Sequence, residues 1–259
     1  MNKLSVLSLI AGATLVSAFT LPGSVAGASF SGRVSFTGDL PAGDAGKVVY
    51  EGEKPEVKPL SIPEDKAKGC AKEGEKMDTV DPSLIIDAKG GLENVVVLVT
   101  VKDAKLAVPE APFVLDQHTC HFTPHVTIVP VGAAVEFKNS DGVSHNVHTY
   151  PGKNDPFNQT IAAGSKESRK LDKEDRIEVK CDIHPWMNSW VIVANTNFYA
   201  VTAADGSFKI DGLPAGEHDV TYWHEKLGKQ TGKIKVGADG KIEPVEIKMG
   251  AKKEGGRKR

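Results

Sequence analysis

The sequence predicts an all-β protein, and two observations support this prediction. Almost every apolar segment either alternates with a period of two residues or is rich in β-branched side chains, which is typical of strands. Such segments lie at residues 30–36, 95–101, 176–180 and 190–193. Turn-forming pairs such as Asp-Gly and Gly-Gly separate them, and no long segment carries the apolar stripe of a helix.

Residues 1–28 have the pattern of a secretory signal peptide. Lys3 supplies a short basic region, an uncharged apolar run follows, and small residues stand near the expected cleavage point. The alternative is a membrane anchor, which Gly12 and Pro22 disfavour. We expect cleavage of the signal and export to the periplasm or the extracellular space. No comparable apolar run follows, so no membrane span is expected in the mature chain.

The charges are nearly balanced, with 32 Lys and Arg against 34 Asp and Glu. A chain without a basic excess gives no indication of a nucleic-acid partner. Residues 250–259 are basic and contain no apolar anchor, so they are predicted to be a disordered tail. The chain without the signal, about 230 residues, is enough for one large or two small domains.

Three potential metal ligands lie within seven residues in the second half of the chain. Cys181, His184 and Met187 place a thiol, an imidazole and a thioether three residues apart. Thiolate and thioether are soft donors that favour Cu(I), while imidazole suits both oxidation states. A fourth donor is available in His145, which follows an apolar alternation at residues 133–137 and a turn containing Asn and Asp. These residue types together predict a copper site.

The two motifs resemble those of the cupredoxins, the small blue copper proteins. In that family the first histidine follows a strand and an Asn-rich turn, and the other ligands share one loop in the order Cys, His, Met. The short spacing here is similar to that of the amicyanin and plastocyanin group and looks most like amicyanin. The resemblance covers residues 113–194. It implies one type 1 copper ion, with His145, Cys181 and His184 in a trigonal plane and Met187 as a long axial ligand.

The resemblance also assigns roles to residues beside the ligands. Asn146 is expected to tie the two ligand loops together by hydrogen bonds. His184 is expected to reach the surface through an apolar patch and to form the exit route for electrons. Pro185 has no N–H and cannot donate a hydrogen bond to the Cys181 sulfur, so we expect a lower reduction potential than in a site with that donor.

Other histidines compete for the role of ligand. His148 lies three residues after His145, and residues three apart on an extended chain face opposite sides, so only one of them can face the metal. The family pattern favours His145 and leaves His148 on the surface. The His-rich segment 118–125 places its side chains on both faces of a strand, so we do not expect a second metal site there.

Three cysteines are present in a chain that is expected to be exported. If Cys181 binds copper, Cys70 and Cys120 remain as a pair, and an oxidising compartment would join them in a disulfide. The alternative is two buried free thiols. A disulfide through Cys181 would exclude the copper site.

The chain is expected to contain two β units. Residues 84–195 form the cupredoxin-like copper domain, after N-terminal strands and a Lys-, Glu- and Pro-rich loop at residues 29–83. Residues 196–249 are similar to the carboxypeptidase regulatory, or prealbumin-like, β-sandwich module, because an Asp-Gly turn is followed by a Leu-Pro-x-Gly corner at residues 213–216.

This C-terminal module supplies too few strands for a stable sandwich on its own. Residues 30–36 and 47–50 resemble the first strand pair of the same family. The copper domain is therefore expected to be inserted within a sandwich built from both ends of the mature chain.

The functional prediction is an exported type 1 copper protein that carries one electron at a time between redox partners. These partners would be redox proteins that bind transiently through a small interface. The alternatives are a copper-binding or copper-delivery protein of the cell envelope, and a structural β-sandwich without redox duty. An enzyme is not expected, since the sequence shows no open-site metal triad and no nucleophile with a base and an orienting acid.

Overall fold

The computed structural model describes residues 45–240 and 242–250, and these residues form an all-β protein, as the sequence predicts. The expected signal peptide, the expected strand at residues 30–36 and residues 251–259 of the expected tail lie outside the described residues. Within the described part of the chain, no helix is long and apolar enough to span a membrane.

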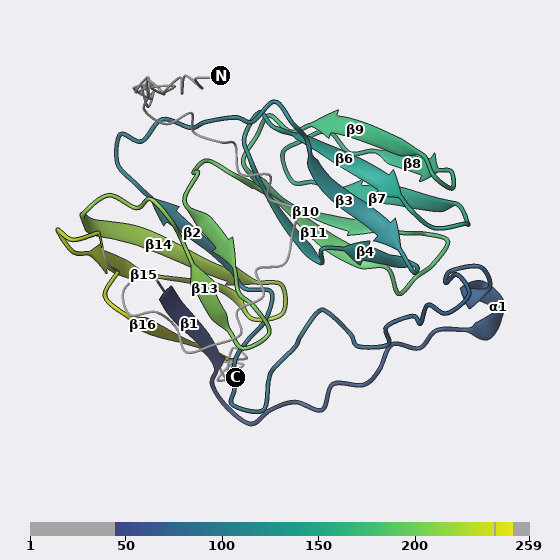
Figure 1. Cartoon of the computed structure of the whole chain (residues 1–259), viewed down its shortest axis with the longest axis horizontal. Coiled ribbons are helices and arrows are strands. Elements are labelled where there is room, and N and C mark those ends of the chain that lie inside the picture. Colours follow the sequence, from purple (N-terminus) through teal and green to yellow (C-terminus); the bar gives the residue numbers. More distant parts are fainter. Residues whose placement is uncertain (1–44, 241, 251–259) are drawn as a thin grey trace, which may run out of the picture.

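Residues 113–194 form a β-sandwich, which we call the central sandwich (Figure 1). Its strands are β3 (Phe113–His118), β4 (His121–Thr123), β5 (Val126–Pro130), β6 (Ala134–Asn139), β7 (His145–Tyr150), β8 (Asn158–Ile161), β9 (Lys166–Lys170), β10 (Asp175–Lys180) and β11 (Asn188–Ala194). One sheet has the strand order β4-β3-β6-β9 and the other β5-β11-β10-β7-β8. Side chains such as Leu115 and Phe137 from the first sheet and Val179 from the second form one apolar core.

The second β unit, which we call the terminal sandwich, contains strands from both sides of the central sandwich in the sequence. Its strands are β1 (Ala45–Tyr50), β2 (Val96–Thr100), β12 (Tyr199–Val201), β13 (Ser207–Lys209), β14 (Gly216–His224), β15 (Gly228–Val236) and β16 (Val245–Met249). They form the sheets β13-β1-β16 and β12-β2-β14-β15. The predicted insertion of one sandwich into another is therefore confirmed.

The predicted boundary of the copper domain needs a correction. Residue 84 is too early a start, because β2 pairs with β12 and β14 in the terminal sandwich. The central sandwich begins with β3 at Phe113. The assignment failed because β2 is a nearly continuous apolar run, and such a run shows that both faces are buried but not against which sheet.

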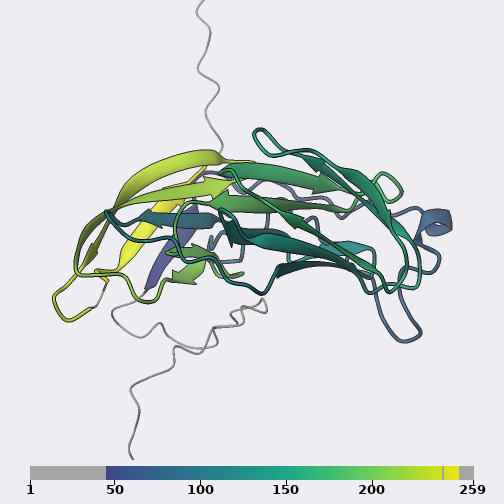
Figure 2. The same ribbon diagram turned by 90° about the horizontal axis from the view of Figure 1, so that it is seen from above.

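The two sandwiches pack against each other through strands that are buried on both faces. On β2, Val97 and Val99 face the core of the terminal sandwich, while Val96 belongs to a separate apolar cluster. The same cluster contains Ile192 of β11 and Trp223 of β14. The sheet faces that point away from the two cores therefore form a third apolar layer, which joins the two sandwiches. The two sandwiches lie side by side in both views (Figures 1 and 2).

The Lys-, Glu- and Pro-rich segment, residues 51–80, is the first part of the long connection between β1 and β2. It contains one short helix, α1 (Glu64–Ala67). The segment leaves the terminal sandwich at β1 and places α1 beyond the far end of the central sandwich (Figures 1 and 2). That end of the sandwich holds the predicted ligands.

Candidate metal centre

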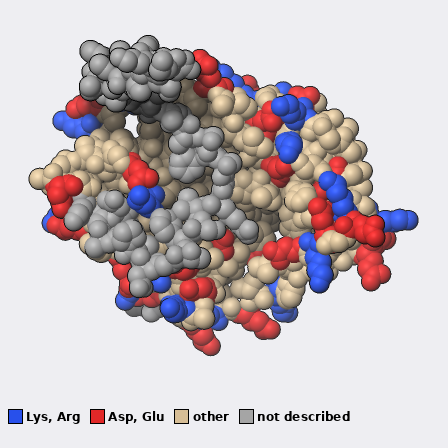
Figure 3. Space-filling model, viewed as in Figure 1, with Lys and Arg blue, Asp and Glu red and all other residues tan. Residues whose placement is uncertain are grey.

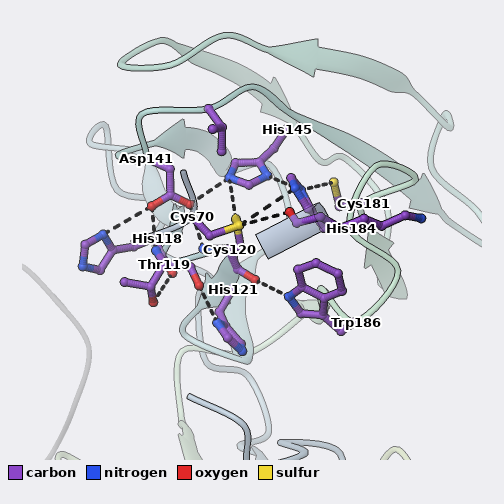
Figure 4. Close-up of a disulfide and its surroundings, with 12 residues drawn as sticks. Cys70, His118, Thr119, Cys120, His121, Asp141, His145, Cys181, His184 and Trp186 are labelled. Carbon is purple, nitrogen blue, oxygen red and sulfur yellow. Dashed lines mark hydrogen bonds and ion pairs between the residues drawn. A yellow bond between two sulfur atoms is a disulfide. The ribbon is translucent and has the colours of Figure 1, made fainter. Parts of the chain in front are cut away.

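The three predicted equatorial ligands converge at one end of the central sandwich (Figure 4). His145 is the first residue of β7, where Val147 on the same strand face points into the apolar core. Cys181 directly follows β10 and continues the inward alternation of Ile177 and Val179. Because β7 and β10 pair as antiparallel neighbours, the start of one strand lies beside the end of the other, and His184 follows in the adjoining loop.

The donor atoms lie at distances that suit a single metal ion. Nδ1 of His145 is 2.9 Å from Nδ1 of His184, and the Cys181 Sγ is 3.8 Å from the same His184 nitrogen. Metal bonds of about 2.0–2.3 Å place neighbouring nitrogen and sulfur ligands about 3–4 Å apart. The exposed fractions are 0% for His145, 2% for Cys181 and 5% for His184. The residues therefore fit a buried ion held by two imidazoles and one thiolate.

A buried carboxylate determines which nitrogen of His145 is available. The Nε2–H of His145 donates to Oδ2 of Asp141 at 2.8 Å, so Nδ1 is the nitrogen that faces the other candidate ligands and that a metal would bind in place of a proton. Asp141 also accepts hydrogen bonds from the backbone N–H groups of Thr119, at 2.6 Å, and Cys120, at 2.8 Å. The sequence placed Asp141 in a turn but did not show that it orients a ligand.

The charge states of this pair follow from the same contacts. Burial by itself would raise the pKa of Asp141, but the hydrogen bonds from His145, Cys120 and Thr119 outweigh it and hold the pKa below its ordinary value. Burial would lower the pKa of His145, but its hydrogen bonds to Asp141 and Cys181 outweigh that effect and raise the pKa. An ionised Asp141 beside His145 is the arrangement that makes this imidazole a better electron donor to a metal.

The other two ligands are biased toward the forms that metals bind. Burial opposes ionisation of the Cys181 thiol, yet the hydrogen bond with His145 and the backbone hydrogen bonds with Asn146 and His184 lower its pKa. Burial lowers the pKa of His184, and the nearby charge of His145 lowers it further. A thiolate and a neutral imidazole are the forms that can coordinate.

Met187 lies in the same tight loop as Cys181 and His184. Two backbone hydrogen bonds of Met187 hold this loop together. Its carbonyl accepts from the Cys181 N–H at 3.2 Å, and its N–H donates to the His184 carbonyl at 2.9 Å. The side chain is buried in the core of the central sandwich together with Trp186. The role of Met187 as the axial ligand stays a prediction.

Asn146 connects the two ligand loops, as the resemblance implied. Its Oδ1 accepts from the backbone N–H of Asp182 at 2.6 Å, and its Nδ2 donates to the Asp182 carboxylate at 2.9 Å. His148 also contacts the Asp182 carboxylate, at 3.1 Å, but from the outer face of β7. It therefore lies away from the metal ligands. Pro185 is exposed on the ligand loop.

The predicted disulfide between Cys70 and Cys120 is present. Its two sulfurs lie against the ligands, with Cys120 Sγ 3.9 Å from Nε2 of His145 and Cys70 Sγ 3.9 Å from Nε2 of His184 (Figure 4). The predicted surface position of His184 is therefore wrong, because Cys70 and the residues before it cover the ring. Local sequence could not show this, since the disulfide joins residues 50 positions apart.

The histidines of the His-rich segment 118–125 have separate partners. His121 contacts the backbone carbonyl of Thr119 through Nδ1 at 2.8 Å. His125 pairs with Glu225 of the terminal sandwich through Nε2. The two histidines thus point to different partners, in agreement with the expectation that the segment's side chains diverge.

Comparison with known proteins gave matches only among solved structures. No protein-family model matches the chain, and no curated protein matches it either. The copper-containing nitrite reductase NirK from Thermus scotoductus SA-01 is similar over 38% of this chain and 26% of its own, with 24% identity and a TM-score of 0.32. The chain thus spans about a quarter of the length of that enzyme.

Two smaller proteins are matched over nearly their whole length. The purple cupredoxin from Nitrosopumilus maritimus is similar over 32% of this chain and 99% of its own, with 21% identity and a TM-score of 0.28. A mutant of amicyanin in the Cu(I) form is similar over 38% of this chain and 98% of its own, with 19% identity and a TM-score of 0.30. These likenesses are partial and concern the fold alone.

Proposed function

We propose that this chain is a type 1 copper protein that carries one electron at a time between redox proteins. The observation that carries the proposal is the buried convergence of two imidazole Nδ1 atoms and one thiol, with Asp141 fixing the tautomer of His145. Bound copper would supply a centre that alternates between Cu(II) and Cu(I). His145, Cys181 and His184 would hold it, and Met187 would complete the set as a weak axial donor.

The surroundings of these residues favour outer-sphere electron transfer. Rapid exchange of an electron requires that the ligands move little when the oxidation state changes. Here the Asn146 bridge fixes the two ligand loops relative to each other, and the hydrogen bond to Asp141 fixes the ring of His145. The nearly complete burial of the three donors excludes water from the centre. The chain's own residues thus supply rigid and dry surroundings for an ion.

An electron carrier fits this site better than an enzyme. Four protein donors would leave no ligand position for a substrate, whereas catalytic metal sites keep one open. Redox proteins that bind briefly are therefore the proposed partners. We further propose that the protein works in an exported, oxidising compartment, which the Cys70–Cys120 disulfide supports.

Copper delivery is the second candidate, and one observation counts against it. A delivery protein must release its metal to an acceptor through ligand exchange, which requires access to at least one donor. His184, the ligand expected to be open, is covered by Cys70. The burial thus favours retention of copper.

Addition of Cu(II) to the purified protein tests the proposal. We expect intense thiolate-to-copper absorption in the visible region and a type 1 electron paramagnetic resonance spectrum. Both should disappear in Cys181→Ser and in His145→Ala. They should remain in His148→Ala, because that residue is on the same strand but faces outward. Absence of the band in the unaltered protein would contradict the proposal.

A further inference from the structure

The segment of residues 51–80 is held by very few buried groups. Cys70 is its only buried residue, with an exposed fraction of 1%. Leu60, Ile62 and Met77 pack against the central core while still partly exposed. The surface of α1 and its neighbours mixes Lys with Asp and Glu at the right edge of the molecule (Figure 3). A segment with so little buried area depends strongly on its disulfide for its position.

Cys70 is also the residue of this segment that reaches the metal centre. Its Sγ lies 3.9 Å from Nε2 of His184, on the side of the ring opposite Nδ1. The backbone carbonyl of Lys66 in α1 lies 3.7 Å from the same Cys70 sulfur, which places the helix beside this contact. The helix and Cys70 together therefore close the face of His184 that points away from the other ligands.

Gly69 brings the segment close to the second ligand loop. It has a φ of +88°, and a Cβ atom on it would stand 2.7 Å from Cγ1 of Val143. Val143 lies two residues before His145. Only glycine therefore fits here without displacing one chain from the other. The segment thus lies against both loops that carry the equatorial ligands.

We propose that residues 51–80 form a lid over the metal centre, latched by the Cys70–Cys120 disulfide, which keeps solvent, chelators and redox partners from direct contact with His184. The part that concerns copper rests on the function proposed above. Electrons would then enter and leave across the lid instead of through an exposed histidine edge. The integrity of this one disulfide would set the access to the site.

The accessibility of His184 in the copper-free protein gives the first test. Diethyl pyrocarbonate modifies accessible neutral imidazoles, and peptide mass spectrometry reports each histidine separately. We expect modification of His184 to be at least about tenfold faster in the double variant Cys70→Ala/Cys120→Ala than in the unaltered protein. His148 on the outer face of β7 serves as an internal standard with an unchanged rate. Equal rates at His184 would overturn the lid.

A second variant separates the lid from the disulfide itself. Gly69→Ala keeps both cysteines but sets a Cβ against Val143, so it should lift the lid and accelerate modification of His184. Lys68→Ala changes a neighbouring exposed lid residue and is the matched control, with no change expected. If the double variant does not fold, as judged by circular dichroism, Gly69→Ala decides the question by itself.

Copper retention gives the third measurement. With Cu(I) bound, transfer to bathocuproine disulfonate should be at least about tenfold faster in Gly69→Ala than in Lys68→Ala. An unchanged rate would overturn the role of the lid in metal access. If the unaltered protein binds no copper, the proposed function fails, whereas the modification of His184 still tests the lid.

Discussion

Asp141 and His145 form a buried pair in which Oδ2 of the carboxylate accepts the Nε2–H of the ring at 2.8 Å. The same carboxylate holds the backbone of Thr119 and Cys120, where the hairpin between β3 and β4 turns with φ values of +50° and +52°. The Asp141 side chain therefore connects a proposed metal ligand, the disulfide and a turn in the left-handed region.

Replacement of Asp141 should weaken copper binding. In Asp141→Asn the neutral amide no longer stabilises the Nε2–H tautomer by its charge, so Nδ1 of His145 becomes a poorer donor. Loss of such an outer contact typically lowers metal affinity by about 10–100-fold, which competition with a chelator would measure. Asp155→Asn changes an exposed carboxylate and should have no effect. Equal affinities of the two variants would refute the role of Asp141.

Pro185→Ala should raise the reduction potential. The substitution provides a backbone N–H that can donate to the Cys181 sulfur, and such a bond stabilises the electron-rich Cu(I) state. A change of about 60 mV corresponds to a tenfold shift of a one-electron equilibrium, and we expect an increase of this order in a redox titration. Ile183→Ala alters an exposed side chain of the same loop but adds no N–H, so its potential should stay unchanged. An unchanged or lower potential in Pro185→Ala would refute the argument.

His224 should make the protein less stable in acid. Burial lowers the pKa of this histidine from 6.5 to about 4. Its Nδ1 accepts from the Lys226 N–H, and its Nε2 has no partner in the described structure. Between pH 6.5 and pH 4 the unfolded chain binds a proton that the folded chain resists, so stability is complete above pH 6.5 and falls as pH decreases.

The size of this effect follows from the shift of the His224 pKa. It corresponds to a loss of about 3 kcal/mol in unfolding free energy by pH 4. Urea unfolding at pH 7 and pH 4 measures how much unfolding free energy is lost in acid. In His224→Gln this loss should be smaller than in the unaltered protein by about 3 kcal/mol. His218→Gln, at a partly exposed position of the same strand, should behave like the unaltered protein. The same pH dependence in all three proteins would contradict the assignment.

Trp223 should be a main contact between the two sandwiches. Its ring lies 5.0 Å from that of Trp190 on β11 and 5.7 Å from the guanidinium of Arg176 on β10, measured to the ring centroid. Trp223→Ala should cost about 3–5 kcal/mol of stability and make the sandwiches unfold in two separate transitions. Calorimetry would show this, with the exposed Tyr150→Ala as control. A single transition with unchanged midpoint would show that the contact contributes little.

Local sequence determined the strands and the ligand candidates. The period-two alternation marks strands because alternate side chains share a face, and it places Cys181 on the inward face of β10 with Val179. The spacing of Cys181, His184 and Met187 is a property of one loop and is visible without the fold. The same alternation showed that only one of His145 and His148 could face the metal, and the resemblance to the cupredoxins selected His145.

Only the tertiary structure decided what surrounds those ligands. Asp141 was visible as a turn residue, but its contact with Cys120 joins the β6–β7 connection to the β3–β4 hairpin, which are adjacent only in space. The cover over His184 comes from Cys70, more than 100 residues earlier in the chain. The periodicity of a segment records which faces are buried, whereas the partner that buries them depends on how distant segments pack. The candidate ligands are thus visible in the local sequence, whereas access to them depends on the whole fold.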